Sequence, residues 1–203
     1  SIPASVTTIE SWGLSIGNLK WVTVEGTTAP TITENSFSGD TKGDGVLYVQ
    51  QDAIDTYHAN EYWNAFNRIY AIGKHPYAVL DGNTLTFYCN DQRATYAEPF
   101  ELNFTSANNS PLYGHKDEIV NVVFDDSFAD FTELASTAYW FYDCGNLTSI
   151  SGLEKVNTSK VTNMAYMFAS CRSLEKICVG DRWTTDQVTS GWGMFTQCNS
   201  LRI

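Results

Sequence analysis

Three carboxylates close together in the sequence, Asp125, Asp126 and Asp130, have the residue type and spacing for acid–base chemistry. Two such groups hydrolyse a glycosidic bond when one is a general acid and the other acts across a cleft as base or nucleophile. The acid must be shielded from water so that it stays protonated. These aspartates directly follow an apolar run at 119–124, which favours a turn at the end of a strand. We therefore expect a structural role for them and no enzymatic activity.

A second carboxylate motif, DTKGDG at residues 40–45, has the glycine turns and closely spaced oxygens that suit calcium. It lacks the middle acidic ligand and the distal glutamate of a calcium loop, so a solvated turn is the better interpretation. The three histidines, His58, His75 and His115, are scattered, and none lies beside a cysteine or serine in a nucleophile motif. The sequence predicts no metal site and no cofactor.

Two tryptophans, Trp183 and Trp192, lie beside polar, threonine-rich turns, where an aromatic ring can stack against a sugar. The alternative is burial, because most aromatic residues of this chain fall at positions where we expect a packed interior. We predict Trp183 and Trp192 as ligand-binding residues.

Five cysteines are an odd number and include no Cys-x-x-Cys pair, which argues against a zinc site and against a complete disulfide framework. Three of them, Cys144, Cys171 and Cys198, recur 27 residues apart. Side chains stacked in such a column run parallel and do not point at each other as a disulfide requires. We predict that these three are small, buried, apolar residues.

The three evenly spaced cysteines belong to a sequence repeat, and the structure of this repeat determines where the candidate binding residues lie. Segments 141–147, 168–174 and 195–201 each read Phe-x-x-Cys-x-x-Leu. A fixed period of this length is typical of stacked units that bury their apolar faces against one another. Leucine and isoleucine after each cysteine predict the short strand of a leucine-rich repeat.

The first part of the chain has strand-like segments followed by apolar and aromatic residues at helical spacing in 52–69. This spacing predicts a helical closing unit with Asp52 as the N-cap. The polar, glycine-rich segment 38–45 predicts a loop. Asp81-Gly82-Asn83 separates two apolar runs and predicts a β-hairpin.

Together these patterns predict a mainly β fold with short helical segments. The predicted architecture is a leucine-rich-repeat-like solenoid in two arrays, joined by the helical closing unit and the hairpin. Residues 1–73 form the first domain, and residues 74–203 form the second, with the hairpin and the array of period 27.

Two parts of the sequence resemble bacterial repeats. Residues 2–9 read IPASVTTI and residues 47–66 contain an LYV, Tyr, Trp and Phe closing signature, so residues 1–73 resemble BspA-like leucine-rich repeats of Bacteroidales and treponemal surface proteins. Around residues 12–14 this copy departs from the usual Ala-Phe-x-x-Cys core. Residues 77–203 resemble the surface-protein repeat of mycoplasmal lipoproteins and gut Bacteroides, and residues 157–168 (NTSKVTNMAYMF) match its motif almost letter for letter. The copy at residues 184–195 is looser, with Gly191 and Trp192 where the motif prefers methionine and its neighbour. The resemblance implies export and surface display, in some cases as adhesins, with no catalytic residues to carry over.

The composition excludes several partners. The formal net charge is -11, and no run of lysine or arginine offers a stripe for phosphate, so we expect no nucleic acid partner and no anionic membrane partner. No stretch approaches the roughly 20 apolar residues of a membrane span. Any secretion signal or anchor is expected outside the sequence given, which we interpret as a fragment of a longer protein.

These observations predict a non-catalytic module, on the cell surface or secreted, that binds a host or bacterial surface protein or glycan as an adhesin. The alternative is a passive structural spacer of a larger surface protein. A binding module should expose a contiguous aromatic or apolar patch of roughly several hundred Å², whereas a spacer should show scattered polar residues.

Overall fold

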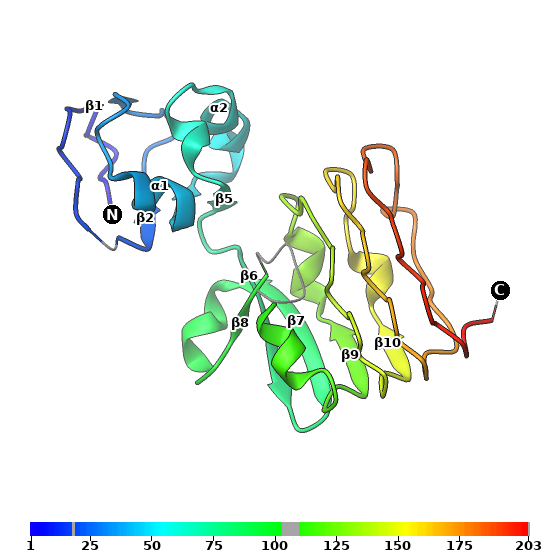
Figure 1. Ribbon diagram of the computed structural model, residues 1–203. Helices are drawn as coiled ribbons and strands as arrows, with labels where there is room; N and C mark the ends of the chain where they lie inside the picture. Colours follow the sequence, from blue (N-terminus) through cyan, green and yellow to red (C-terminus); the bar gives the residue numbers. More distant parts are fainter. Residues whose placement is uncertain (18, 103–109, 203) are drawn as a thin grey trace. The chain divides into compact units, whose positions relative to one another are not determined.

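The computed structural model describes residues 1–17, 19–102 and 110–202 (Figure 1). The chain divides into two compact units, Ser1–Lys74 and His75–Ile203, which we describe separately. This division lies one residue beyond the predicted boundary. Strands make up 24% of the chain and helices 17%, so it is mainly β with few helices.

The first unit is built on two small parallel sheets. One sheet pairs β1 (Thr8–Ile9) with β3 (Thr31–Ile32). The other has the strand order β2-β4-β5 and consists of β2 (Trp21–Thr23), β4 (Val46–Val49) and β5 (Arg68–Ala71). Alternate side chains of a strand point to opposite faces. Val22, Leu47 and Ile69 are paired neighbours on three strands and all lie in the core of this unit.

The helical segments of the first unit are short: α1 (Gly39–Asp44), η1 (Gln51–Ala53), α2 (Ile54–Ala59) and η2 (Trp63–Ala65). The predicted loop at 38–45 is wrong, because α1 forms there and the Ser38 hydroxyl accepts from the Thr41 N–H at 3.3 Å as its cap. The predicted cap is also wrong. Asp52 lies within η1, and Ala53 precedes α2 without a side-chain cap.

Aromatic side chains fill the core of the first unit. Trp63 is fully buried and its ring packs 5.4 Å from Phe37, 5.2 Å from Tyr57 and 5.9 Å from Phe66. Its indole N–H donates to the Pro30 carbonyl at 2.9 Å, which satisfies the one polar atom of the ring. The aromatic residues of the closing signature therefore serve packing.

The second unit contains one open, mixed sheet of order β10-β9-β7-β6-β8. Its strands are β6 (His75–Asp81), β7 (Thr84–Asn90), β8 (Phe100–Glu101), β9 (Asn121–Phe124) and β10 (Ser149–Ser151). Short 3-10 turns connect them: η3 (Asp91–Thr95), η5 (Pro111–His115), η6 (Asp126–Asp130) and η7 (Leu153–Lys155). The predicted hairpin is present as β6–β7, and Gly82 has the positive φ of 57° that its turn requires.

Beyond β9 the chain folds as three similar segments that lie side by side (Figure 1). We name residues 136–147, 163–174 and 190–201 the first, second and third repeat segments. Isolated parallel bridges join Ser136 to Asn163 and Asn163 to Ser190. Between segments, alternate backbone N–H groups donate to carbonyls 26 residues later, as from Phe141 to Met167 at 2.9 Å and from Phe168 to Met194 at 3.0 Å.

The predicted leucine-rich-repeat-like solenoid in two arrays is wrong. The sheets are open, and the central sheet is mixed because the antiparallel hairpin β6–β7 is part of it. Of the short strands predicted after the cysteines, the one after Cys144 forms as β10, whereas no strand forms at 174–179 after Cys171. Within the repeat segments the backbone turns at Tyr139, Asp143 and their equivalents, which have positive φ, and an extended strand cannot pass through such residues.

Candidate functional site

The predicted column of cysteines is buried at two of its three positions. Cys144 and Cys171 are buried, Cys198 is partly exposed, and all are free thiols. The Cys171 thiol donates to the Phe141 carbonyl at 3.1 Å, and the Cys198 thiol donates to the Phe168 carbonyl at 3.0 Å. Burial raises the pKa of Cys144 to about 12 and raises the pKa of Cys171 as well. Cys171 and Cys198 therefore join neighbouring repeat segments through thiol hydrogen bonds as well as by packing.

The acidic cluster ends β9, as the sequence predicted. Asp125 caps η6 and accepts hydrogen bonds from Ser127 at 2.9 Å from N–H and 2.6 Å from Oγ. These hydrogen bonds lower the pKa of Asp125, whereas a general acid needs a raised pKa. Asp126 is exposed and forms an ion pair with Lys155 at 2.7 Å. Asp130 is exposed as well.

The remaining candidates for chemistry are dispersed. His75 lies 3.2 Å from Glu101 and His115 lies 3.0 Å from Glu118, while His58 is on α2 in the first unit. Within the described residues, no group of three or more histidine, cysteine or acidic side chains is arranged to hold a metal ion. The side chains of Asp40 and Asp44 lie outside the described residues.

A contiguous aromatic row runs along the repeat segments, and we define it as Tyr113, Tyr142, Tyr139, Tyr166 and Trp192. Neighbouring ring centroids lie 6.0 Å apart for the first pair, then 5.6, 5.2 and 5.4 Å along the row. The rings of Tyr139 and Tyr166 stack at an interplanar angle of 24°. The three inner tyrosines are partly exposed, Tyr113 is 37% exposed and Trp192 is 73% exposed.

Two tyrosines of the row have an unusual backbone. Tyr139 and Tyr166 have φ values of 62° and 56°, in the left-handed region that favours glycine. Gly193 occupies the equivalent position in the third repeat segment with φ 65°, and a Cβ there would meet the Tyr166 ring at 2.8 Å. The aromatic side chains at 139 and 166 are thus held against the preference of their own backbone, a kind of strain found at functional sites.

One end of the row is charged. The Lys116 ammonium lies 5.6 Å from the centre of the Tyr113 ring and 3.2 Å from a carboxylate oxygen of both Asp117 and Asp143. Hydrogen bonds to Asp117 and Asp143 raise the pKa of Lys116, so it stays charged. At the centre of the row, burial raises the pKa of Tyr139, and so does the proximity of Tyr166.

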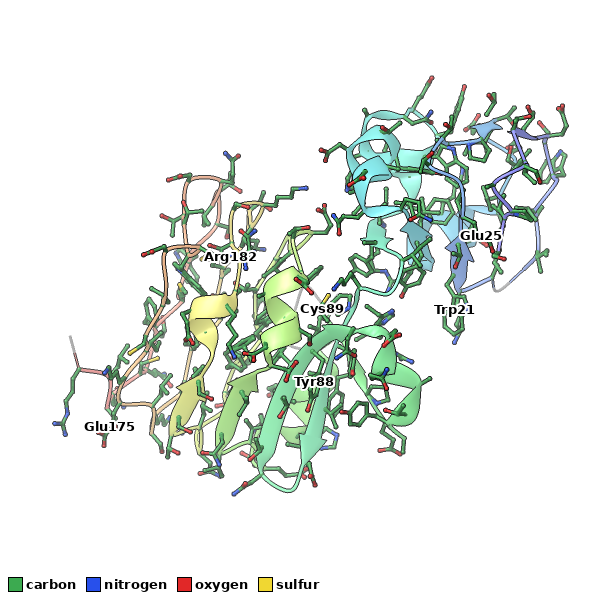
Figure 2. The ribbon with its side chains drawn as sticks, turned by 180° about the vertical axis from the view of Figure 1, so that it is seen from behind. Trp21, Glu25, Tyr88, Cys89, Glu175 and Arg182 are labelled. Atoms are coloured by element: carbon green, nitrogen blue, oxygen red, sulfur yellow. The ribbon has the colours of Figure 1, made fainter. Side chains whose placement is uncertain are left out.

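The two predicted ligand-binding residues are separated. Trp192 belongs to the aromatic row, whereas Trp183 has no ring contact with the row in the described part of the chain. Trp183 follows Arg182, which donates to the Ala129 carbonyl at 2.8 Å and is labelled in Figure 2. The sequence reasoning missed Tyr139 and Tyr166 because it assigned most aromatic residues to the interior. The signal was the glycine at position 193 of the same repeat column.

Residues 125–203 match the family model described as "Mycoplasma protein of unknown function, DUF285". The match agrees with the predicted resemblance of this part to mycoplasma-type repeats. It does not extend to residues 1–124, so the BspA-like resemblance of the first domain stays a prediction. Neither a curated protein nor a solved structure matches the chain. Among the described residues, no helix has both the length and the apolar character needed to cross a bilayer.

Proposed function

We propose that this chain is a non-catalytic binding module, on the cell surface or secreted, whose aromatic row contacts a host or bacterial surface protein or glycan. The left-handed backbone of Tyr139 and Tyr166 carries this proposal, because the cost of placing a bulky residue there is offset when the side chain serves binding. The match to mycoplasma-type repeats supports the expectation of a surface role that the sequence raised.

The geometry of the row indicates what it offers a ligand. The stacked rings of Tyr139 and Tyr166 cover one face of each other, so they present mainly edges to solvent. Trp192 packs on Tyr166 at an interplanar angle of 71° and remains 73% exposed. Its indole therefore provides the ring surface on which a sugar or an apolar side chain stacks. Trp183 is a second, independent candidate for the same role.

Binding to a panel of glycans, mucins and extracellular-matrix proteins tests this function. The variants are Trp192→Ala in the row, Trp183→Ala outside it, and Trp21→Ala as a matched control. Trp21 is 60% exposed and projects from β2 in the first unit (Figure 2). We expect saturable binding that Trp192→Ala weakens about tenfold, the usual effect of removing a central aromatic contact, while Trp21→Ala leaves it unchanged.

Each other outcome has a defined meaning. Loss of binding in Trp183→Ala alone would move the site away from the row. Silence of the folded chain across the whole panel would contradict the binding module and favour the structural spacer.

A further inference from the structure

A second row of side chains accompanies the aromatic row, and we define it as the polar row: Lys116, Asp143, Ser170, Arg172 and Gln197. Asp143, Ser170 and Gln197 occupy equivalent positions of the three repeat segments. The Ser170 hydroxyl donates to Gln197 Oε1 at 3.2 Å, and the Arg172 guanidinium donates to the same oxygen at 3.4 Å. At the other end, the Lys116 ammonium lies 3.2 Å from a carboxylate oxygen of Asp143. The polar row is therefore held in place by contacts among its own members.

The two rows share an unusual backbone. Within the described part of the second unit, every residue other than glycine that has a positive φ belongs to one of them: Tyr139, Tyr166, Asp143, Ser170 and Gln197. A positive φ costs free energy in a residue with a Cβ, and strained residues of this kind cluster at functional sites. The strain falls on both rows, which indicates that the rings and the polar side chains serve one surface.

The rows meet at Lys116. Its ammonium lies 5.6 Å from the centre of the Tyr113 ring in the aromatic row, and it is also paired with Asp143 in the polar row. Asp143 directly follows Tyr142, another member of the aromatic row, in the chain. A ligand that contacts the rings at this end is therefore within reach of the polar side chains as well.

The inner part of the aromatic row offers ring edges to a ligand. The stacked rings of Tyr139 and Tyr166 cover one face of each other, and Tyr142 packs against them at interplanar angles of 64° and 88°. The edge of an aromatic ring carries partial positive charge, and a phenol hydroxyl both donates and accepts hydrogen bonds. Both features favour oxygen atoms, whereas an apolar or cationic side chain needs a ring face. The tyrosines therefore suit an oxygen-rich ligand.

Charge narrows the class of ligand further. The chain has a formal net charge of -11, which repels an anionic ligand. In the polar row, the cations Lys116 and Arg172 are matched by the carboxylates of Asp143 and of Asp117, which also pairs with Lys116. A cationic ligand thus finds no excess of carboxylate there. An uncharged ligand rich in hydroxyl groups fits both rows best.

We propose that the two rows bind a neutral glycan, an inference that rests on the binding function proposed above for the aromatic row. One sugar stacks its C–H face on the exposed indole of Trp192. Other sugar hydroxyls form hydrogen bonds with the tyrosine hydroxyls and with polar-row side chains such as Ser170 and Arg172. Because the repeat segments place these groups at regular intervals, many weak contacts add along the surface.

An array of immobilised oligosaccharides tests the proposal with the purified full chain. It carries neutral oligosaccharides beside their sialylated and sulfated forms, together with mucins before and after enzymatic removal of their glycans. One variant is Tyr166→Gly, which removes a ring while keeping a residue that tolerates the positive φ. The other is Arg172→Ala, which removes a donor of the polar row. Its matched control is Lys176→Ala, since Lys176 is an exposed cation of the second unit outside both rows.

We expect saturable binding of neutral oligosaccharides. Tyr166→Gly should weaken it about tenfold and Arg172→Ala about two- to tenfold, the usual effects of losing an aromatic contact and a hydrogen bond. Lys176→Ala should leave the affinity unchanged. Raising sodium chloride from about 0.05 to about 0.5 M should change the affinity less than about twofold, because salt screens contacts between charges and a neutral ligand makes none.

Three results would overturn the neutral glycan while leaving the proposed binding function intact. They are binding to mucin that survives removal of its glycans and is lost in Trp192→Ala, preference for the sialylated or sulfated forms, and binding that added salt abolishes. Full binding of neutral oligosaccharides by folded Tyr166→Gly and Arg172→Ala variants would also overturn the assignment to these rows. Silence across the array and the mucins would overturn the neutral glycan together with the binding function.

Discussion

Replacing Tyr166 by glycine and by alanine separates the backbone from the ring, because both variants remove the side chain that stacks on Tyr139. The φ of 56° costs a residue with a Cβ roughly 1–2 kcal/mol, a cost that glycine avoids. Glycine in turn loses roughly 0.5–1 kcal/mol more conformational freedom on folding than alanine does. We therefore expect Tyr166→Gly to be more stable than Tyr166→Ala by about 0.5–1 kcal/mol.

Urea unfolding measures this difference, provided that both variants have the same dependence of free energy on denaturant. Ala165→Gly is the matched control in the same repeat, since Ala165 has no positive φ and is 7% exposed. There glycine should be the less stable residue, by about 0.5–1 kcal/mol. A Tyr166→Ala variant as stable as Tyr166→Gly would refute the reasoning, because it would show that the left-handed backbone carries no strain.

Three further predictions concern stability. Cys171→Ala should lose about 1–2 kcal/mol of unfolding free energy because a buried sulfur and its hydrogen bond disappear, whereas the exposed Cys178→Ala should change it by less than about 0.5 kcal/mol in the same urea experiment. Gly152→Ala should lower the melting temperature more than Gly73→Ala. Both glycines have positive φ, but only at position 152 would the added Cβ clash with a backbone carbonyl, that of Phe124. Desolvation raises the pKa of Glu101, but hydrogen bonds and charge interactions with His75 and Arg93 lower this pKa below 4.5 overall. The stability that the Glu101 carboxylate contributes is therefore present above its unfolded pKa and is lost as pH falls through the lowered value. Glu101→Gln should flatten the pH dependence of the unfolding free energy in this acidic window and leave that dependence unchanged near neutrality.

Local turn chemistry made part of the fold predictable. Asp81-Gly82-Asn83 specifies a tight hairpin because its residues tolerate positive φ, and β6 and β7 pair along their whole length as a result. The short helix at Gly39–Asp44 was missed because its glycines favour a loop. Its signal is Ser38, which offers a cap three residues before Thr41.

The period of 27 predicted that the segments lie side by side, but it did not determine their backbone. Columns of phenylalanine, cysteine and leucine pack equally well on extended strands and on an irregular chain, since burial is not directional. Positive φ at Asp143, Ser170 and Gln197 bends the backbone in each repeat. None of these residues is glycine, so the sequence carried little warning of the bend.

The aromatic row is hard to explain by stability alone. Two residues in the left-handed region cost roughly 2–4 kcal/mol together. Tyr139 and Tyr166 form four ring pairs, with each other, with Tyr142 and with Trp192, and each pair contributes roughly 0.5–1.5 kcal/mol beyond the burial of area. The ring contacts and the partial burial of Tyr139 and Tyr166 are thus of the same size as the backbone cost, so the net effect of these two residues on stability is small. The third segment has Gly193 at the same position and still pairs with the second through the same hydrogen bonds. The fold therefore tolerates glycine at this position, and the proposed contact of the aromatic row with a ligand supplies one reason for tyrosine there.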